Sequence, residues 1–270
     1  MCNNLNAVIL SSHQHAMEIK TPHTLKNPPV KEAITQIKVT PKTKFNKSFF
    51  ESYAQLEKEK YPTSAPQQET LFQFISGEHG AHSGVTNKGI SGYKLSSKDG
   101  QNIIQIAKDR FAVSRLEPYR TWDDLIQETH RTWVNYISIF EPSSVIGLSV
   151  RYINHFLIPS SMQKFEDYLE CTPVIPKGLP QSFASFYVNY RLPNPETNAV
   201  ANVQLIFEGA IETEDKSGMI IPIVLDSDVY KICTLDPSSD DIWNAFNELH
   251  DFKNTVFFQS LTYKTLEMFQ

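Results

Sequence analysis

Polar side chains that suit specific contacts alternate with apolar ones along three segments of the chain, 145–153, 183–192 and 201–208. Because successive side chains of an extended strand point to opposite faces, these segments predict a sheet with one apolar and one polar face. The candidate binding residues on the polar face are Arg151, Tyr187, Asn189, Arg191, Asn202, Gln204 and Glu208. Arginine, tyrosine and asparagine favour recognition, although an ordinary solvated sheet face gives the same pattern.

Two chemistries fit this polar face. In the first, the face or an edge strand binds a partner, and Arg151 and Arg191 anchor an anionic group through charge-assisted hydrogen bonds. In the second, the protein is an enzyme acting on a phosphorylated small molecule or nucleic acid, with Glu208 as the base. The enzymatic alternative requires Arg151, Arg191 and Glu208 to converge in one cleft. Since the sequence shows no catalytic constellation, it favours a non-enzymatic binding or assembly module.

Glu32 is a further candidate, at the start of the first predicted strand in NPPVKEAITQIKV, residues 27–39. General acid–base catalysis needs a partner group and a raised pKa, and the neighbouring residues supply neither. We therefore expect Glu32 to mark the beginning of the domain, paired with an arginine across the sheet. A binding role on the polar face is the alternative.

Two predicted helices carry the same Glu-x-His pattern, at Glu128/His130 and Glu248/His250. Residues two apart on a helix point about 200° away from each other, so neither pair can share a metal ion. His250 lies on the apolar stripe of its helix, and Asn254, one turn later, is its expected hydrogen-bond partner. We interpret His250 as a packed histidine.

No pattern in the sequence predicts a metal ion or a cofactor. His79 and His82, beside Glu78, have H-x-x-H spacing and could hold a metal if the glycine-rich segment folded over a third ligand, but outside a helix this spacing is not specific. The segment also lacks the residues of a phosphate-binding loop, and no nucleophile elbow is present. The three cysteines are widely spaced, which is typical of a reducing compartment rather than of a disulfide framework.

Hydrophobic periodicity and turn residues divide the chain into two similar series of elements. Helices are predicted over 46–62, 121–140, 161–169 and 239–268. Strands are predicted over 33–39, 71–76, 92–97, 102–107, 111–116, 145–156, 183–192, 199–209, 219–225 and 229–233. Five glycines in 77–92 predict a long loop there. The helix at 121–140 begins with a capping-box pattern, Thr121 with Asp124.

The order of these elements predicts an α+β fold. Residues 1–25 are expected to be an irregular extension, followed by a first half over 26–142 and a second over 143–270. Each half has a strand, a helix, antiparallel strands and a long helix. One half cannot bury both a sheet face and a helix stripe alone, so we expect the two to form one compact unit. Long helices would then cover one sheet face, in a helix-grip or saddle-like arrangement.

Four segments carry a resemblance to a family. They are NPPVKEAITQIKV at 27–39, IAKDRFAVSRLEPYRTW at 106–122, VRYINHFLIP at 150–159 and DIWNAFNELHDFKNTVFFQSLT at 241–262. In this order the chain resembles a sporadically distributed, uncharacterised bacterial family over residues 27–269. The chain departs from it at Ser114, in a position where related sequences often have tryptophan. The resemblance implies a common fold and a bacterial or phage-related origin, and no reaction.

Charge and composition narrow the classes of partner. The 270 residues carry a net charge of −5, with nine Lys/Arg and five Asp/Glu in residues 1–60 and the acidic excess in the remainder. A nucleic-acid-binding groove usually shows a basic excess, so nucleic acid is disfavoured as a partner. No apolar run reaches the roughly 18 residues of a membrane span. We expect a cytoplasmic protein that binds a protein partner, another copy of itself or a small anionic ligand.

Overall fold

The computed structural model describes residues 25–42, 47–77, 80–162, 164–213 and 218–270, with backbone alone for 68–77 and 80–90. These residues form an antiparallel sheet of ten strands and four α-helices. The strands are β1 Val30–Thr40, β2 Thr63–Gly77, β3 Gly80–Ser96, β4 Asn102–Ala107, β5 Arg110–Leu116, β6 Ser144–Pro159, β7 Phe186–Asn194, β8 Ala199–Phe207, β9 Ile211–Glu212 and β10 Met219–Leu235. The helices are α1 Lys47–Glu57, α2 Trp122–Phe140, α3 Asp241–Ser260 and α4 Tyr263–Glu267, with a 3-10 turn at Phe165–Asp167.

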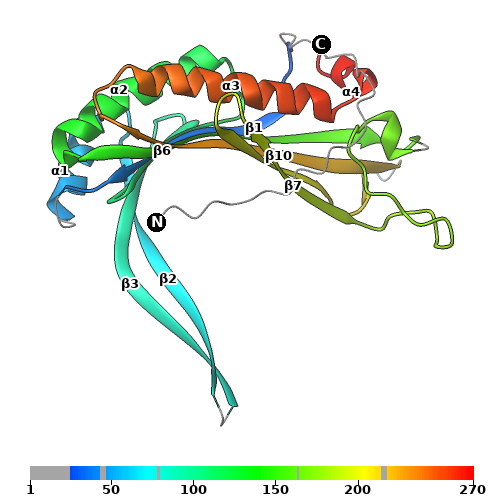
Figure 1. Ribbon diagram of the computed structural model, residues 1–270, viewed down its shortest axis with the longest axis horizontal. Helices are drawn as coiled ribbons and strands as arrows, with labels where there is room; N and C mark the ends of the chain where they lie inside the picture. The colour runs from blue at the N-terminus through cyan, green and yellow to red at the C-terminus, as the bar shows by residue number, and fades with distance from the viewer. Residues whose placement is uncertain (1–24, 43–46, 78–79, 163, 214–217) are drawn as a thin grey trace.

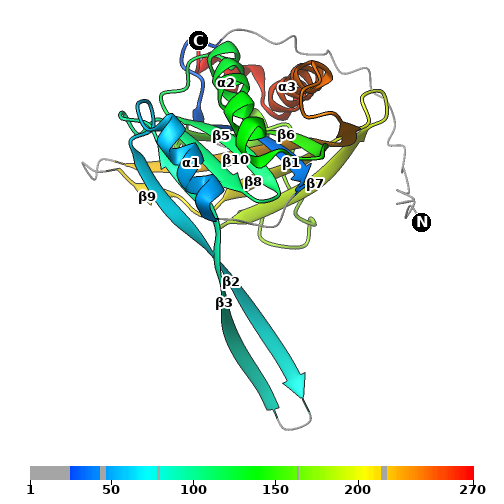
Figure 2. The same cartoon turned by 90° about the vertical axis from the view of Figure 1, so that its left-hand side faces the viewer.

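The sheet has the order β2-β3-β4-β5-β1-β6-β10-β8-β7, and β9 pairs with β10. The helices all lie on one side of it (Figure 1). The β2–β3 hairpin extends away from the body on the opposite side (Figures 1 and 2). We call the sheet face that no described helix covers the open face. The predicted mixture of a large antiparallel sheet and helices is confirmed.

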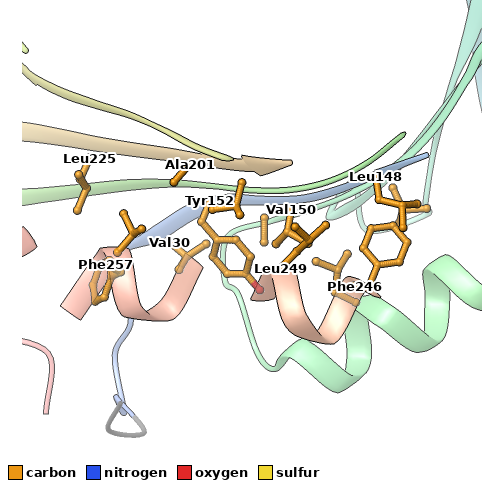
Figure 3. Close-up of a cluster of buried hydrophobic side chains, with 14 of the residues drawn as sticks. Val30, Leu148, Val150, Tyr152, Ala201, Leu225, Phe246, Leu249 and Phe257 are labelled. Carbon is orange, nitrogen blue, oxygen red and sulfur yellow. The ribbon is translucent and has the colours of Figure 1, made fainter. Parts of the chain in front are cut away.

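The hydrophobic core lies between the helices and the sheet. Side chains alternate along β6, where Val150 and Tyr152 are buried and Arg151 between them is half-exposed. Figure 3 shows Val150 and Tyr152 pointing toward α3, next to Leu249. The alternation predicted for this strand therefore places apolar side chains under the helices and polar ones on the open face.

Helix α2 begins and ends as local sequence dictates. Thr121 caps its start, with its hydroxyl accepting a hydrogen bond from the backbone N–H of Asp124 at 3.1 Å, so the predicted cap is confirmed. At the other end Glu141 has a φ of 42°, the left-handed conformation common after a helix. Trp133 is a buried residue of this helix, and its indole donates a hydrogen bond to the carbonyl of Pro237 at 2.9 Å.

The prediction of a loop over 77–92 is wrong. Most of these residues belong to β3, which pairs with β2 over the length of the hairpin. Glycine has no side chain to pack, but its backbone groups still form ladder hydrogen bonds. At Gly92 the missing side chain is itself required, because a Cβ there would lie 2.3 Å from the carbonyl oxygen of Ile106 on β4.

Several predicted elements also change. The helix expected over 161–169 is only a 3-10 turn at Phe165–Asp167, and the strand expected over 71–76 is the longer β2. The strands expected at 219–225 and 229–233 are one continuous strand, β10. The helix expected over 239–268 is two helices, because Leu261 between them is extended and forms a bridge with Leu169. The helix expected over 46–62 has its described part at Lys47–Glu57.

Candidate functional site

Most of the predicted site residues lie in two neighbouring rows that run across β6, β10, β8 and β7 on the open face, and the second row extends to β1. The first row contains Arg151, Asp228, Asn202 and Arg191. The second row contains Glu32, Ile153, Asp226, Gln204 and Asn189. We call these two sets the polar rows. Tyr187 is one position beyond the second row, opposite Ile206.

Arg151 is paired within the sheet. Its Nε and Nη2 donate hydrogen bonds to Oδ1 and Oδ2 of Asp226 at 2.9 and 2.5 Å. Asp226 is 6% exposed, whereas the arginine is half-exposed. The hydrogen bond to Asp226 raises the pKa of Arg151, and the charge of Glu32 adds a smaller contribution. The ion pair of Arg151 is therefore with Asp226. Glu32, for which an arginine partner across the sheet was expected, is not the partner of this arginine.

Asp228 lies opposite Arg151 in the first row and is largely buried. Burial raises its pKa, and Arg151 opposes that shift. Its Oδ1 has no hydrogen-bond partner among the described residues. Two carboxylates and one guanidinium thus share the centre of the open face, so this region has no basic excess.

Tyr187, Asn189 and Arg191 lie on the edge strand β7 and are exposed, whereas Asn202 and Gln204 on β8 are partly exposed. Arg191 donates to the hydroxyl of Tyr230, and its guanidinium lies 5.8 Å from the centroid of that ring. Asn189 donates to the hydroxyl of Tyr187 at 2.9 Å, and Tyr187 is 59% exposed. These contacts hold the polar side chains of the edge against one another.

Glu208 is not part of the polar rows. It follows the last residue of β8, six residues beyond Asn202, which corresponds to roughly 20 Å along an extended chain. Arg151 and Arg191 are themselves separated by β10 and β8. The three side chains that the enzymatic alternative requires therefore do not converge.

A second site, which the sequence reasoning missed, lies on the helix side of the sheet. A pocket of about 340 Å³ opens between the segment Leu25–Val30, the segment Tyr119–Trp122, β6 and α3. Its lining combines aromatic rings with four other apolar residues, Leu25, Pro28, Pro29 and Val30, and with several polar side chains. We call it the Lys253 pocket, after the one lysine in its lining.

Lys253 is a buried amine without a carboxylate partner. It is 6% exposed, and its Nζ lies 3.7 Å from the centroid of the Tyr152 ring and donates to Oδ1 of Asn254 at 2.5 Å. Among the described residues no carboxylate oxygen lies within 4.0 Å of Nζ. Burial lowers the pKa of Lys253 to about 7, and the charge of Asp251 opposes the shift.

The neighbours of this amine are neutral and ordered. His250 stacks on Trp122 with ring centroids 4.3 Å apart, and burial together with Lys253 lowers the pKa of His250 to about 3. Asn254 lies 3.5 Å from His250 Nε2, so the predicted partner is in place, at a long distance. The hydroxyls of Tyr119 and Tyr152 are 2.7 Å apart, and burial raises the pKa of both tyrosines, that of Tyr119 to about 12.

The sequence held a signal for this pocket. Lys253 is four residues after Leu249 and four before Phe257, on the apolar stripe of α3. A lysine within such a stripe either extends its amine to solvent or is buried, and a buried lysine has a perturbed pKa.

Family models and curated proteins give no match to this chain, and the described residues form neither a metal site nor a membrane-spanning helix. The chain matches no protein-family model, and no curated protein shows significant similarity to it. Within the described ranges, no three His, Cys, Asp or Glu side chains gather as metal ligands do. His79 and the side chain of His82 lie outside the described residues. No described helix has the length and apolar character needed to cross a membrane.

Proposed function

We propose that this protein is a non-enzymatic binding or assembly module of a bacterial cytoplasm, and that a protein partner docks on the open face. The observation that supports this most directly is the pairing within the polar rows. Arg151 is held by Asp226 and Arg191 by Tyr230, so both side chains are fixed on strands instead of surrounding a cleft. Ordered side chains lose little conformational entropy on binding.

The composition of the open face fits a protein better than a nucleic acid. Arg151 is outnumbered by Asp226 and Asp228, so the centre offers no net positive charge to phosphates. Exposed apolar and aromatic side chains flank the rows, among them Leu157, Tyr187 and Ile232. A polar centre without a basic excess, with apolar and aromatic neighbours, fits a protein interface, whether with another protein or with a second copy of the chain.

The proposal includes an internal duplication and membership of the bacterial family that the sequence resembles. From the centre of the sheet outward, the first half has the strands β1-β5-β4-β3 and the second half β6-β10-β8-β7. In each half the first strand is central, the last strand is next to it, and a long helix follows on the same side. This correspondence supports a saddle-like or helix-grip arrangement of two related halves, 26–142 and 143–270.

The double variant Tyr187→Ala with Arg191→Ala tests the docking surface. Both residues are exposed at the β7 edge, so the variant is expected to fold normally. Tyr263→Ala with Lys264→Ala, an aromatic residue and a cation on α4, is the matched control. Self-association is measured by sedimentation, and partner capture is measured in extracts of the native cells. Loss of either interaction in the β7 variant alone supports the proposal, and equal behaviour of both variants contradicts it.

A further inference from the structure

The Lys253 pocket is distinct from the open face, because it lies on the other side of the sheet between β6 and α3. Its volume of about 340 Å³ is at the lower end of the range for small-molecule sites. Aromatic side chains form much of its wall, namely Tyr119, Trp122, Tyr152 and Phe257. A ligand of this pocket is therefore small and has a flat apolar part that packs against rings.

The charged side chains that line the pocket are both positive. Lys253 lies inside, and Arg120 lines the pocket as an exposed residue. No aspartate or glutamate is among the described residues that line it. A buried amine is stable in its charged form only when it is paired, and the described residues provide no carboxylate oxygen within 4.0 Å of its Nζ. The missing partner of Lys253 is therefore an anion.

The arrangement around the amine leaves room for that anion. An ammonium group has three N–H donors. One is directed to Asn254 Oδ1, and the Tyr152 ring lies under the nitrogen at 3.7 Å, where it favours a cation. Since no further protein acceptor is present among the described hydrogen bonds of Lys253, the remaining donors are available to a ligand.

We propose that the Lys253 pocket binds a small organic acid with a flat apolar body. The carboxylate of the ligand pairs with the Lys253 ammonium, and the apolar body lies between the rings of Trp122, Tyr152 and Phe257. Arg120 attracts the acid to the opening. His250, held flat against Trp122, forms part of the wall and carries no charge.

Benzoate and benzamide test this site by calorimetric titration at pH 6, because they share a shape and differ in charge. Benzoate is expected to bind the wild-type protein at least about tenfold more tightly than benzamide, as one charged hydrogen bond implies. Lys253→Met should abolish that preference. Lys264→Met is the matched control, since Lys264 also lies over a tyrosine ring, 4.2 Å from the centroid of Tyr168, but is exposed and outside the pocket.

The pH dependence of the wild-type protein gives a second readout that needs no variant. Benzoate binding should weaken as the pH rises from 6 to 9, whereas benzamide binding should not change. The titratable and charged groups that line the pocket with the amine are His250 on α3, Tyr119 and Arg120 before α2, and Tyr152 on β6, while Asp251 acts on the amine only through its charge. The histidine and both tyrosines are neutral over this range, so the loss would report the proton of Lys253.

Three results would overturn the proposal. The first is equal affinity for benzoate and benzamide in the wild-type protein, and the second is undiminished benzoate binding in Lys253→Met. The third is no benzoate binding in the millimolar range. Benzaldehyde with cyanoborohydride is tested in parallel, because a covalent adduct at Lys253 without benzoate binding would make the pocket a site for carbonyl compounds instead.

Discussion

Arg151 and Asp226 form a two-point ion pair across the β6–β10 contact, with Nε–Oδ1 and Nη2–Oδ2 distances of 2.9 and 2.5 Å. The carboxylate is 6% exposed and the guanidinium is half-exposed. Removal of Arg151 would therefore leave Asp226 as a buried charge. Arg191, at the edge of the sheet, has no such role, because it contacts the hydroxyl of Tyr230 and not a carboxylate.

The first prediction follows from this difference between the two arginines. Arg151→Ala should lower the free energy of unfolding by about 2 kcal/mol, because it leaves a buried carboxylate unpaired. Arg191→Ala should change it by less than about 0.5 kcal/mol, as for other exposed residues. Urea denaturation of both variants measures the effect. An equal loss of unfolding free energy in the two variants would show that the buried carboxylate of Asp226 does not need Arg151 as its partner.

A second prediction concerns Glu57, which is buried at the end of α1. Arg131 of α2 donates to both of its carboxylate oxygens, at 3.2 and 2.7 Å, and Asn135 donates at 2.6 Å. Arg131→Met should destabilise the protein by about 3 kcal/mol, because it leaves the buried carboxylate without its cation. Lys60→Met is the control, since Lys60 is exposed and its bond is to Glu128. Similar melting temperatures for the two variants would contradict this interpretation.

The third prediction tests the packing of α2 on the sheet. Trp133 is 1% exposed, and its ring lies against Phe111 and Tyr136. Trp133→Ala should therefore lower the free energy of unfolding by about 3–5 kcal/mol. Val134, the next residue, is 47% exposed, and Val134→Ala should have little effect. Thermal or urea unfolding distinguishes the two, and an unchanged melt for Trp133→Ala would exclude a core position.

A fourth prediction follows from the lowered pKa of Lys253. Above pH 7 the folded protein has lost this proton, while the unfolded chain keeps it up to its ordinary pKa of 10.5. The unfolded state then binds more protons, so the free energy of unfolding of the wild-type protein rises with pH. Relative to Lys253→Met, the gain should approach about 1.4 kcal/mol per pH unit between pH 7 and 9.

The matched comparison is Lys264→Met. Its free energy of unfolding should differ from that of the wild-type protein by nearly the same amount at every pH in this range, because Lys264 is exposed. Urea unfolding at several pH values measures both differences. A Lys253→Met difference that is equally flat would mean that the amine keeps its proton in the folded protein. At pH 6 the methionine variant should be the more stable protein, since it buries no charge.

Elements set by local residues could be predicted, and contacts between distant strands could not. The capped helix α2 and the alternation of β6 follow from the spacing of side chains within one segment. The central partners Asp226 and Asp228 were missed because Asp-Ser-Asp is poor in strand formers and reads as a break between two strands. In the structure these residues continue β10, where Arg151 on the neighbouring strand compensates the charges.

The Lys253 pocket was missed for a related reason. The stripe on α3 showed that position 253 faces the core, but not what covers it. Its wall comes from Pro28 and Pro29, from Trp122 and from β6, segments that precede Lys253 by about 100 to 225 residues in the chain. Only the assembled fold shows that these segments leave a space instead of filling it.

The pairing of β1 with β6 at the centre of the sheet has a consequence during synthesis. β1 ends at Thr40 and β6 begins at Ser144, so about 100 residues separate them. At a translation rate of about 5–20 residues per second, roughly 5–20 s pass between their emergence from the ribosome. β5 can cover one side of β1 in that time, while the other side presents unpaired backbone groups. The nascent first half is therefore a template for strand addition, and it is most exposed to aggregation before β6 arrives.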